Sequence, residues 1–264
     1  MTPMRRVVAA IITAPGTNRD PDMAFALARA GATPITVSTR RLLDSTAVVD
    51  DADLVVLPGG FSFADALGAG RLFAHELEEV ASGLIHRAIA SRRPILGVCN
   101  GFQALMNLGV FETHADPQDR VAPASPRRMA LGPNDGGAFT CEWVEVVPSS
   151  TACIWTAGLD APIACPIAHG EGRLTVADDA WADLVATDRI AFRYAGRNPN
   201  GSRGAVAGIC DASGLVLGLM PHPENHVTDR QHPGFHRRKH GAVATPAGTL
   251  GLRLFEEGVR HARA

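Results

Sequence analysis

The sequence predicts an α/β fold with a doubly wound, mostly parallel sheet, helices on both faces and additional antiparallel strands in the C-terminal half. In the first hundred residues, short runs rich in Val and Ile alternate with helical patterns, which is typical of a parallel sheet covered on both faces. Later, short strand candidates follow one another with turns between them, which favours antiparallel pairing. No linker-like stretch divides the 264 residues, so we expect a single domain over residues 1–264.

The elements of the first half follow from their flanking residues. Asp20 and Pro21 provide a helix start and Gly31 a natural stop, so a helix is expected between them. A long helix-compatible stretch runs from about 64 to 90. Strands are expected where apolar and β-branched residues gather, at residues 7–12, 35–37, 54–57 and 94–98.

Two stretches rich in Pro and Gly predict loop insertions in the second half, at about residues 114–137 and 231–249. A closing helix is expected at 250–262. The strand candidates of this half are residues 138–147, 163–168, 190–194, 205–210 and 216–220.

Composition gives no support to several kinds of partner and site. Lys and Arg number 25 against 27 Asp and Glu, a net charge of −2, so nothing favours a nucleic acid or a membrane as partner. The five cysteines form no C-x-x-C pair, so neither a disulfide framework nor a zinc site is indicated. The apolar segment at 7–12 is too short to cross a membrane and lacks a cleavage site. We therefore expect a cytoplasmic protein.

The most informative segment is the strand-to-helix junction around Cys99. An apolar strand runs into Gly97-x-Cys99-x-Gly101, and a helical pattern follows at once, as at the nucleophile elbow of α/β-hydrolases. A helix start favours the thiolate form, and its free N–H groups, notably that of Asn100, would face a developing oxyanion. The alternative is a buried cysteine at a tight turn. The pattern favours a nucleophile.

A thiol nucleophile needs a base, and His222 is the best candidate among ten histidines. It follows an apolar strand and lies between two prolines, Pro221 and Pro223. Glu224 could accept a hydrogen bond from its imidazole and so set the tautomer. Without Cys99, a surface histidine between prolines would be the favoured interpretation of this segment. Since Cys99 and His222 both follow strands of an α/β sheet, where such folds place their sites, a Cys–His–Glu triad is the better interpretation.

A third segment, Pro58-Gly59-Gly60-Phe61, ends another strand. Consecutive glycines let the backbone approach a ligand and direct N–H groups at it. By itself, this segment is better explained by an ordinary turn at the end of a strand. Beside the other two segments, the N–H of Gly60 is expected to be the second oxyanion donor, together with that of Asn100.

The combined motifs resemble those of the class I (triad-type) glutamine amidotransferases, whose hallmarks are a Gly-Gly oxyanion loop, G-x-C-x-G and a His-Pro-Glu ending. More narrowly, the sequence is similar to the glutaminase subunits of phosphoribosylformylglycinamidine synthases, from purine biosynthesis. The matching segments occur in the family's order and cover most of the chain. They are residues 15–18, 58–62, 97–103, 168–172, 198–202 and 220–224.

The resemblance implies a reaction. Cys99 attacks the side-chain amide of glutamine, His222 protonates the departing ammonia, and water then hydrolyses the γ-glutamyl thioester with Glu224 orienting His222. It also implies weaker expectations for glutamine contacts at Gly59, Phe61 and Gln103, besides the oxyanion donors.

The resemblance further implies a partner. Ammonia would pass to a separate synthetase subunit that uses ATP and Mg²⁺ to convert formylglycinamide ribonucleotide to the amidine, and a third small subunit is left open. This sequence has no Walker-type phosphate loop, so no cofactor or metal is expected in this chain. Two rivals stay open: another class I amidotransferase subunit or a cysteine hydrolase on the same scaffold, and a catalytically silent regulatory subunit.

Two histidine-containing segments have weaker interpretations. His169 and Glu171 offer too few ligands for zinc. Because the family resemblance covers their segment, it implies a structural or partner-facing loop there. His232, His236 and His240 recur every four residues, but neighbouring Pro and Gly argue against a helix. A solvated basic loop is favoured there over a metal site.

Overall fold

The computed structural model describes residues 5–112, 127–239 and 250–264, built around a nine-stranded sheet. Neighbouring strands are parallel from β2 to β11 and antiparallel from β11 to β7. In spatial order the strands are β2 (Ala32–Ser38), β1 (Val7–Thr13), β3 (Leu54–Leu57), β4 (Ile95–Val98), β11 (Val216–Leu219), β10 (Val206–Cys210), β9 (Phe192–Tyr194), β6 (Thr140–Pro148) and β7 (Ile163–His169). The predicted doubly wound α/β class is confirmed.

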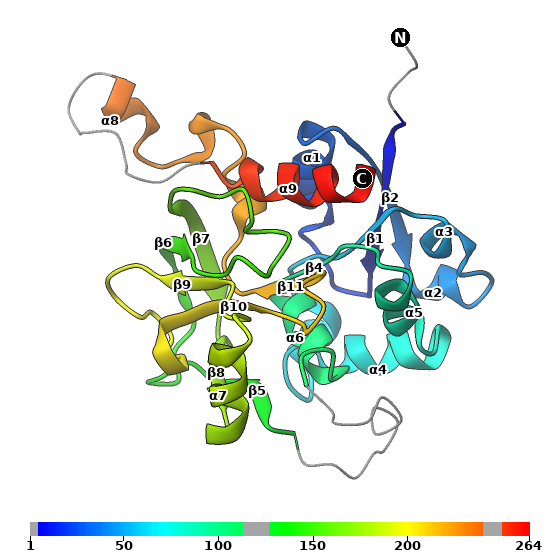
Figure 1. The fold of residues 1–264 in the computed structure, drawn as a ribbon, viewed down its shortest axis with the longest axis horizontal. Coiled ribbons are helices and arrows are strands. Elements are labelled where there is room, and N and C mark those ends of the chain that lie inside the picture. The colour runs from blue at the N-terminus through cyan, green and yellow to red at the C-terminus, as the bar shows by residue number, and fades with distance from the viewer. Residues whose placement is uncertain (1–4, 113–126, 240–249) are drawn as a thin grey trace.

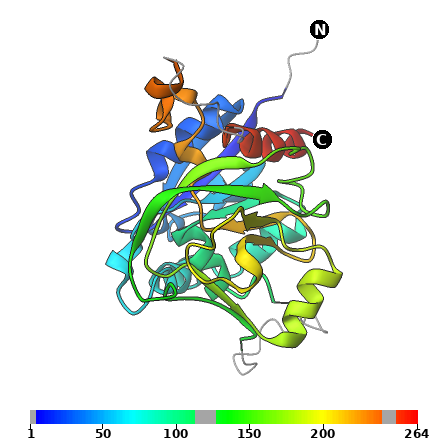
Figure 2. The ribbon, with the colours of Figure 1, turned by 90° about the vertical axis from the view of Figure 1, so that its left-hand side faces the viewer.

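Helices cover both faces of the parallel half (Figure 1). On one face, α1 (Asp20–Arg29) and α9 (Leu252–Arg263) pack against each other and against β1. On the other, α6 (Asn100–Asn107) lies on β3, β4 and β11, and α4 (Arg71–Val80) packs on α6. The long strands β6 and β7 lie at the opposite end of the sheet from β1 and β2, and they face the viewer in Figure 2.

The smaller elements lie around this framework. Helix α5 (Leu84–Ala90) follows α4, and β5 and β8 form a separate antiparallel pair. The bounds of the others are α2 (Thr39–Leu42), α3 (Ala47–Asp50), β5 (Met129–Gly132), β8 (Arg173–Val176), α7 (Asp178–Ala186) and α8 (Phe235–Lys239).

The central strands are apolar because both of their faces are covered. All four residues of β3, of β4 and of β11 are buried. Close packing beneath α6 requires glycine twice: a Cβ on Gly101 would lie 1.9 Å from the carbonyl oxygen of Leu57, and one on Gly218 would lie 2.0 Å from the ring of Phe102. This packing brings the first turn of α6 directly onto the ends of the central strands.

The nine strands expected from the sequence are the nine strands of this sheet. The expected long helix at 64–90 is wrong, because Gly68, Gly70 and Gly83 have φ values of 104°, 72° and 67° and divide it into a 3₁₀ turn, α4 and α5. Strand β5 lies inside the first expected loop insertion, of which residues 113–126 lie outside the described part. Strand β8 and helix α7 were not expected either.

The second expected insertion contains the short helix α8, against the expectation of a loop, while residues 240–249 lie outside the described part. Within the described residues, no helix combines the length and apolar character needed to span a membrane.

Candidate active site

Cys99 occupies the junction between β4 and α6 in a strained backbone conformation, with φ 49° and ψ −104°. Its N–H donates to the carbonyl oxygen of Leu219 in β11 at 2.8 Å, and its own carbonyl oxygen accepts from the N–H of Gln103 at 3.0 Å. These bonds hold the elbow from both sides, so the thiol is presented at the start of α6 as the G-x-C-x-G pattern predicts.

His222 and Glu224 lie in the turn that follows β11. The Nδ1 atom of His222 is 2.7 Å from Oε1 of Glu224, and both side chains are buried. The N–H of His222 donates to the carbonyl oxygen of Pro166 at 2.8 Å, which ties the turn to β7, the edge strand at the antiparallel end of the sheet. Because Nδ1 faces the carboxylate, Nε2 is the imidazole nitrogen left for chemistry.

Electrostatics favour the imidazolium form of His222. Burial acts to lower the pKa of His222, but the negative charges of Glu224 and of the Cys99 sulfur outweigh it and raise that pKa from 6.5 to about 10. A protonated imidazole beside a thiolate is the charge arrangement that a cysteine nucleophile needs.

Gly59 shows how close the thiol and the imidazole lie. A Cβ at this position would be 2.7 Å from Cε1 of His222 and 3.4 Å from Cβ of Cys99. The parallel register of β4 and β11 pairs Val98 with Leu219, the last residues of the two strands. Cys99 and His222, which follow these strands, therefore lie at the same edge of the sheet. Segments more than a hundred residues apart in the sequence therefore meet at one point.

The glycine loop after β3 is held by the loop after β1. Gly60, with φ 137°, forms an isolated antiparallel bridge with Thr17, and a Cβ on it would lie 2.7 Å from the backbone nitrogen of Asn18. Phe63 N–H donates to the carbonyl oxygen of Pro15 at 2.7 Å. The segments 15–18 and 58–62, which the sequence singled out separately, thus form one unit. The role of the Gly60 and Asn100 N–H groups as oxyanion donors stays a prediction.

The side chain of Asn100 is the centre of a polar network beneath this loop. Its Oδ1 accepts from the hydroxyl of Ser62 at 2.5 Å, and its Nδ2 donates to Asp65 and to Oε1 of Gln103, both at 3.1 Å. The Nε2 atom of Gln103 donates to the carbonyl oxygen of Glu171. Both ends of the Gln103 amide are thus engaged within the protein, and its contact with glutamine stays a prediction.

Two phenylalanines form an apolar rim near the glycine loop. Phe61 is 42% exposed, and its ring centroid lies 6.2 Å from that of Phe139, which is 54% exposed. Phe61 was expected to contact substrate and stays a candidate, whereas Phe139 was not singled out, because an isolated phenylalanine in a Gly-rich segment carries no signal.

The expectation of a structural or partner-facing loop at 169–172 needs correction at His169. This residue ends β7 and is only 3% exposed, with Nδ1 3.0 Å from Oδ1 of Asn134. Burial and, secondly, the charge of His222 lower the pKa of the His169 imidazole from 6.5 to about 4. The sequence motif was noted, but its position beside His222 follows only from the order of strands.

No group of three or more potential metal ligands occurs within residues 5–112, 127–239 and 250–264. Of the three periodic histidines, His232 packs on Trp143 with ring centroids 4.6 Å apart, and His236 lies on α8. His240 lies outside the described residues.

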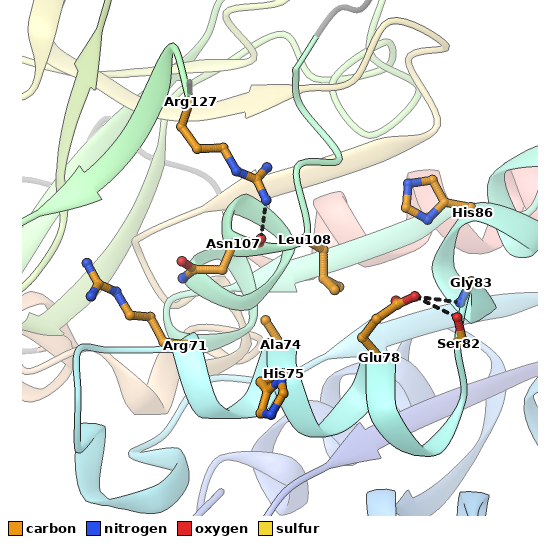
Figure 3. A pocket seen from close by; sticks show the side chains of 10 residues that line it. All are labelled: Arg71, Ala74, His75, Glu78, Ser82, Gly83, His86, Asn107, Leu108 and Arg127. Carbon is orange, nitrogen blue, oxygen red and sulfur yellow. Dashed lines mark hydrogen bonds between the residues drawn. The ribbon is translucent and has the colours of Figure 1, made fainter. Parts of the chain in front are cut away.

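A separate cavity of about 640 Å³ lies between α4, α5 and the C-terminal end of α6 (Figure 3). Arg71, Glu78, His86 and Arg127 are among the residues that line it. Arg127 donates to the carbonyl oxygen of Asn107 at 2.7 Å, and Glu78 accepts from Ser82 and from the N–H of Gly83. None of the predicted site residues lines this cavity, which lies at the end of α6 away from Cys99.

A thiol on a strand-to-helix elbow, with a His–Glu pair after the adjacent strand, is the arrangement expected of a cysteine-dependent triad site. Residues 6–262 match the family described as the CobB/CobQ-like glutamine amidotransferase domain. A relative from Treponema denticola, named phosphoribosylformylglycinamidine synthase subunit PurQ, is 40% identical over 241 residues, covering 84% of this chain and 89% of the relative. One of the same name from Dehalococcoides mccartyi is 34% identical over 98% of this chain and 99% of its own.

Solved structures agree with this assignment. A chain from the structure of PurLQS from Thermotoga maritima is 30% identical, with a TM-score of 0.74 over 97% of this chain and 99% of that one. The glutaminase domain of Trypanosoma brucei CTPS shares the fold, with a TM-score of 0.52 at 13% identity over 92% of this chain and 97% of that one. The chain belongs to the CobB/CobQ-like glutamine amidotransferase family, and its relatives named above are PurQ subunits.

Proposed function

We propose that this chain is the glutaminase subunit of a phosphoribosylformylglycinamidine synthase. It hydrolyses glutamine to glutamate through a thioester on Cys99 and supplies ammonia to a separate synthetase subunit. The observation that carries the proposal is the meeting of Cys99, His222 and Glu224 at one edge of the sheet, in a chain 40% identical to a PurQ subunit.

In the first half of the reaction, the Cys99 thiolate attacks the carboxamide carbon of glutamine. The N–H groups of Gly60 and Asn100 stabilise the oxyanion, each lowering the barrier by roughly 3 kcal/mol. His222, which the charges of Glu224 and Cys99 keep protonated, gives its Nε2 proton to the departing nitrogen. The C–N bond breaks, and ammonia leaves a γ-glutamyl thioester.

In the second half, water attacks the thioester carbon. His222, now neutral, takes one proton from the water, and the C–S bond breaks to release glutamate and regenerate the thiolate. Glu224 holds the imidazole in one tautomer and stabilises it when charged, because its Oε1 stays 2.7 Å from Nδ1.

Ammonia then passes to the synthetase subunit. That subunit uses ATP and Mg²⁺ to convert formylglycinamide ribonucleotide to formylglycinamidine ribonucleotide, so this chain itself needs no cofactor. The similarity to a chain of PurLQS supports a multisubunit assembly, and we include a third small subunit in the proposal. We infer that the reaction takes place in the cytoplasm, since all five cysteines are free thiols.

The proposal is tested by combining the chain with its synthetase partner and supplying either glutamine or an ammonium salt. The Cys99→Ala variant should bind the partner, lose glutamine-dependent amidine formation and retain the ammonium-dependent reaction. Cys141→Ala, at an exposed cysteine on β6, is the matched control and should keep both reactions. Retention of glutamine-dependent activity by Cys99→Ala would refute the mechanism.

The same assay distinguishes the proposed function from the two alternatives, a silent regulatory subunit and a different amidotransferase or cysteine hydrolase. A silent regulatory subunit would release no glutamate with wild-type chain under any condition. A different amidotransferase or a cysteine hydrolase would release glutamate without forming the amidine.

A further inference from the structure

The buried imidazole of His169 has a defined tautomer. Its Nδ1 lies 3.0 Å from Oδ1 of Asn134, which also accepts from the N–H of Gly172 at 3.1 Å. The orientation of the Asn134 amide follows from its Nδ2, which donates to the carbonyl oxygens of His169 at 2.8 Å and Ala138 at 3.0 Å. Since Oδ1 can only accept, Nδ1 of His169 carries the proton, and Nε2 presents an acceptor lone pair.

Two observations relate the His169 ring to the candidate triad. The carbonyl oxygen of Ala168, the preceding residue, is 3.8 Å from Sγ of Cys99, and the charge of His222 acts on the His169 ring. Nε2 of His169 is buried and has no hydrogen-bond partner in the described part of the chain, whereas His222 interacts with both Glu224 and Cys99. Buried polar atoms normally have a partner, so a substrate-derived or solvent group is the natural one here.

We propose that Nε2 of His169 accepts a hydrogen bond from the water that hydrolyses the γ-glutamyl thioester, and so positions that water. The attacking water gives one proton to Nε2 of His222 as its oxygen bonds to the thioester carbon and the C–S bond breaks. Its second proton stays on that oxygen, directed at His169, until the product leaves as the γ-carboxylic acid, which then loses this proton to solvent to give glutamate. With both protons directed at imidazole nitrogens, the oxygen lone pair points at the carbon.

The two imidazoles have separate tasks. His169 is neutral near pH 7, since its pKa is held at about 4, so it accepts a hydrogen bond but does not take the proton. His222, paired with Glu224, takes the proton. His169 is therefore a positioning residue whose effect is confined to deacylation, since acylation involves no water.

Two substitutions of His169 test its two ring nitrogens separately. In His169→Asn the amide Nδ2 can replace Nδ1–H and donate to Asn134, but nothing replaces Nε2. In His169→Gln the side-chain oxygen can reach the position of Nε2, while the donor to Asn134 is lost. A purely structural role predicts that Asn is the better replacement, whereas the proposed role predicts that Gln is better.

The measurement is the partition of the thioester between water and added hydroxylamine, in the complex with the synthetase partner. His169→Asn should raise the ratio of γ-glutamyl hydroxamate to glutamate by roughly tenfold, the effect of losing one neutral hydrogen bond. The initial burst of ammonia per active site should keep its rate. His169→Gln should stay within about threefold of wild type. The ratio counts only active molecules, so partial unfolding of a variant does not change it.

Two results would overturn the inference: an unchanged ratio in His169→Asn, or a rise in KM without a fall in kcat, which would indicate a contact with glutamine itself. The inference rests on the proposed function, and the two fail differently. If wild type gives no hydroxamate, the thioester mechanism fails. If wild type does and His169→Asn matches it, only the role of His169 fails.

Discussion

The carboxylate of Glu224 lies 2.7 Å from Nδ1 of His222 with no exposed surface of its own. Burial, together with the charge of Glu224, also raises the pKa of the neighbouring Cys165 thiol, as a carboxylate close to it requires. A charge–charge contact removed from water in this way is strong, and it makes the protonation state of His222 depend on Glu224.

Glu224→Gln should lower the pKa of His222 from about 10. Burial disfavours the imidazolium form, and the variant lacks the carboxylate charge that offsets this effect. NMR titration of the imidazole would measure this. Glu142→Gln, which removes a surface ion pair with Arg197, is the control and should leave the value unchanged. An unchanged pKa in Glu224→Gln would show that the carboxylate does not set it.

The same shift predicts a pH dependence of stability. The folded-state pKa of His222 is above the ordinary 6.5, so its protonation stabilises the fold fully below about pH 6.5. This contribution is lost as the pH rises through 10. The free energy of unfolding, measured in urea, should therefore fall less steeply over this interval in Glu224→Gln than in wild type.

His169 should give the opposite sign at acid pH. Its folded-state pKa of about 4 lies below 6.5, so the unfolded chain binds its proton more readily, and stability is lost as the pH falls from 6.5 to 4. His169→Asn removes this titration. In urea unfolding, the variant should lose less stability than wild type between pH 6.5 and 4, and equal losses would contradict the assigned pKa.

Gly59→Ala should strongly lower activity while preserving the fold. The added methyl group would lie 2.7 Å from Cε1 of His222, which must shift away from Cys99. A displacement of about 1 Å costs roughly 10²-fold in kcat. Gly132→Ala is the control, since nothing lies within 4 Å of its Cβ position. Steady-state glutaminase kinetics in the complex would compare the two, and a fully active Gly59→Ala would contradict this geometry.

Gly101→Ala should act on stability instead. Its Cβ would be 1.9 Å from the carbonyl oxygen of Leu57, so α6 would have to move off β3. Overpacking of this kind costs about 1–3 kcal/mol of the free energy of unfolding. Urea denaturation compared with Gly132→Ala would measure it, and equal midpoints would show that α6 can shift freely.

Sequence patterns predicted the large sheet well, because strands buried on both faces are continuous apolar runs that need no tertiary information to recognise. They also predicted which residues end these strands, and the structure brings Cys99, His222 and Glu224 together as expected, while their roles remain predictions. The breaks at Gly68, Gly70 and Gly83 were missed, since a helical pattern does not reveal left-handed backbone angles.

The missed part of the site depends on contacts between distant strands. His169 acquires its low pKa from burial and from His222, and its tautomer from Asn134, which lies in a segment expected to be a loop. Neither neighbour is near it in the sequence. Similarly, β5 and β8 are short strands that pair with each other, and neither has a sequence pattern that identifies it without its partner.

Strand β11 is hydrogen-bonded to β4 on one side and β10 on the other, so it enters the sheet between an early and a late part of the chain. During synthesis on the ribosome, Cys99 emerges long before His222 exists. Until β11 is inserted and the turn after it is formed, the Cys99 sulfur has no His222–Glu224 pair beside it, so a nascent or truncated chain lacks the proton donor of the proposed reaction. We therefore expect a chain truncated before β11 to release no glutamate from glutamine.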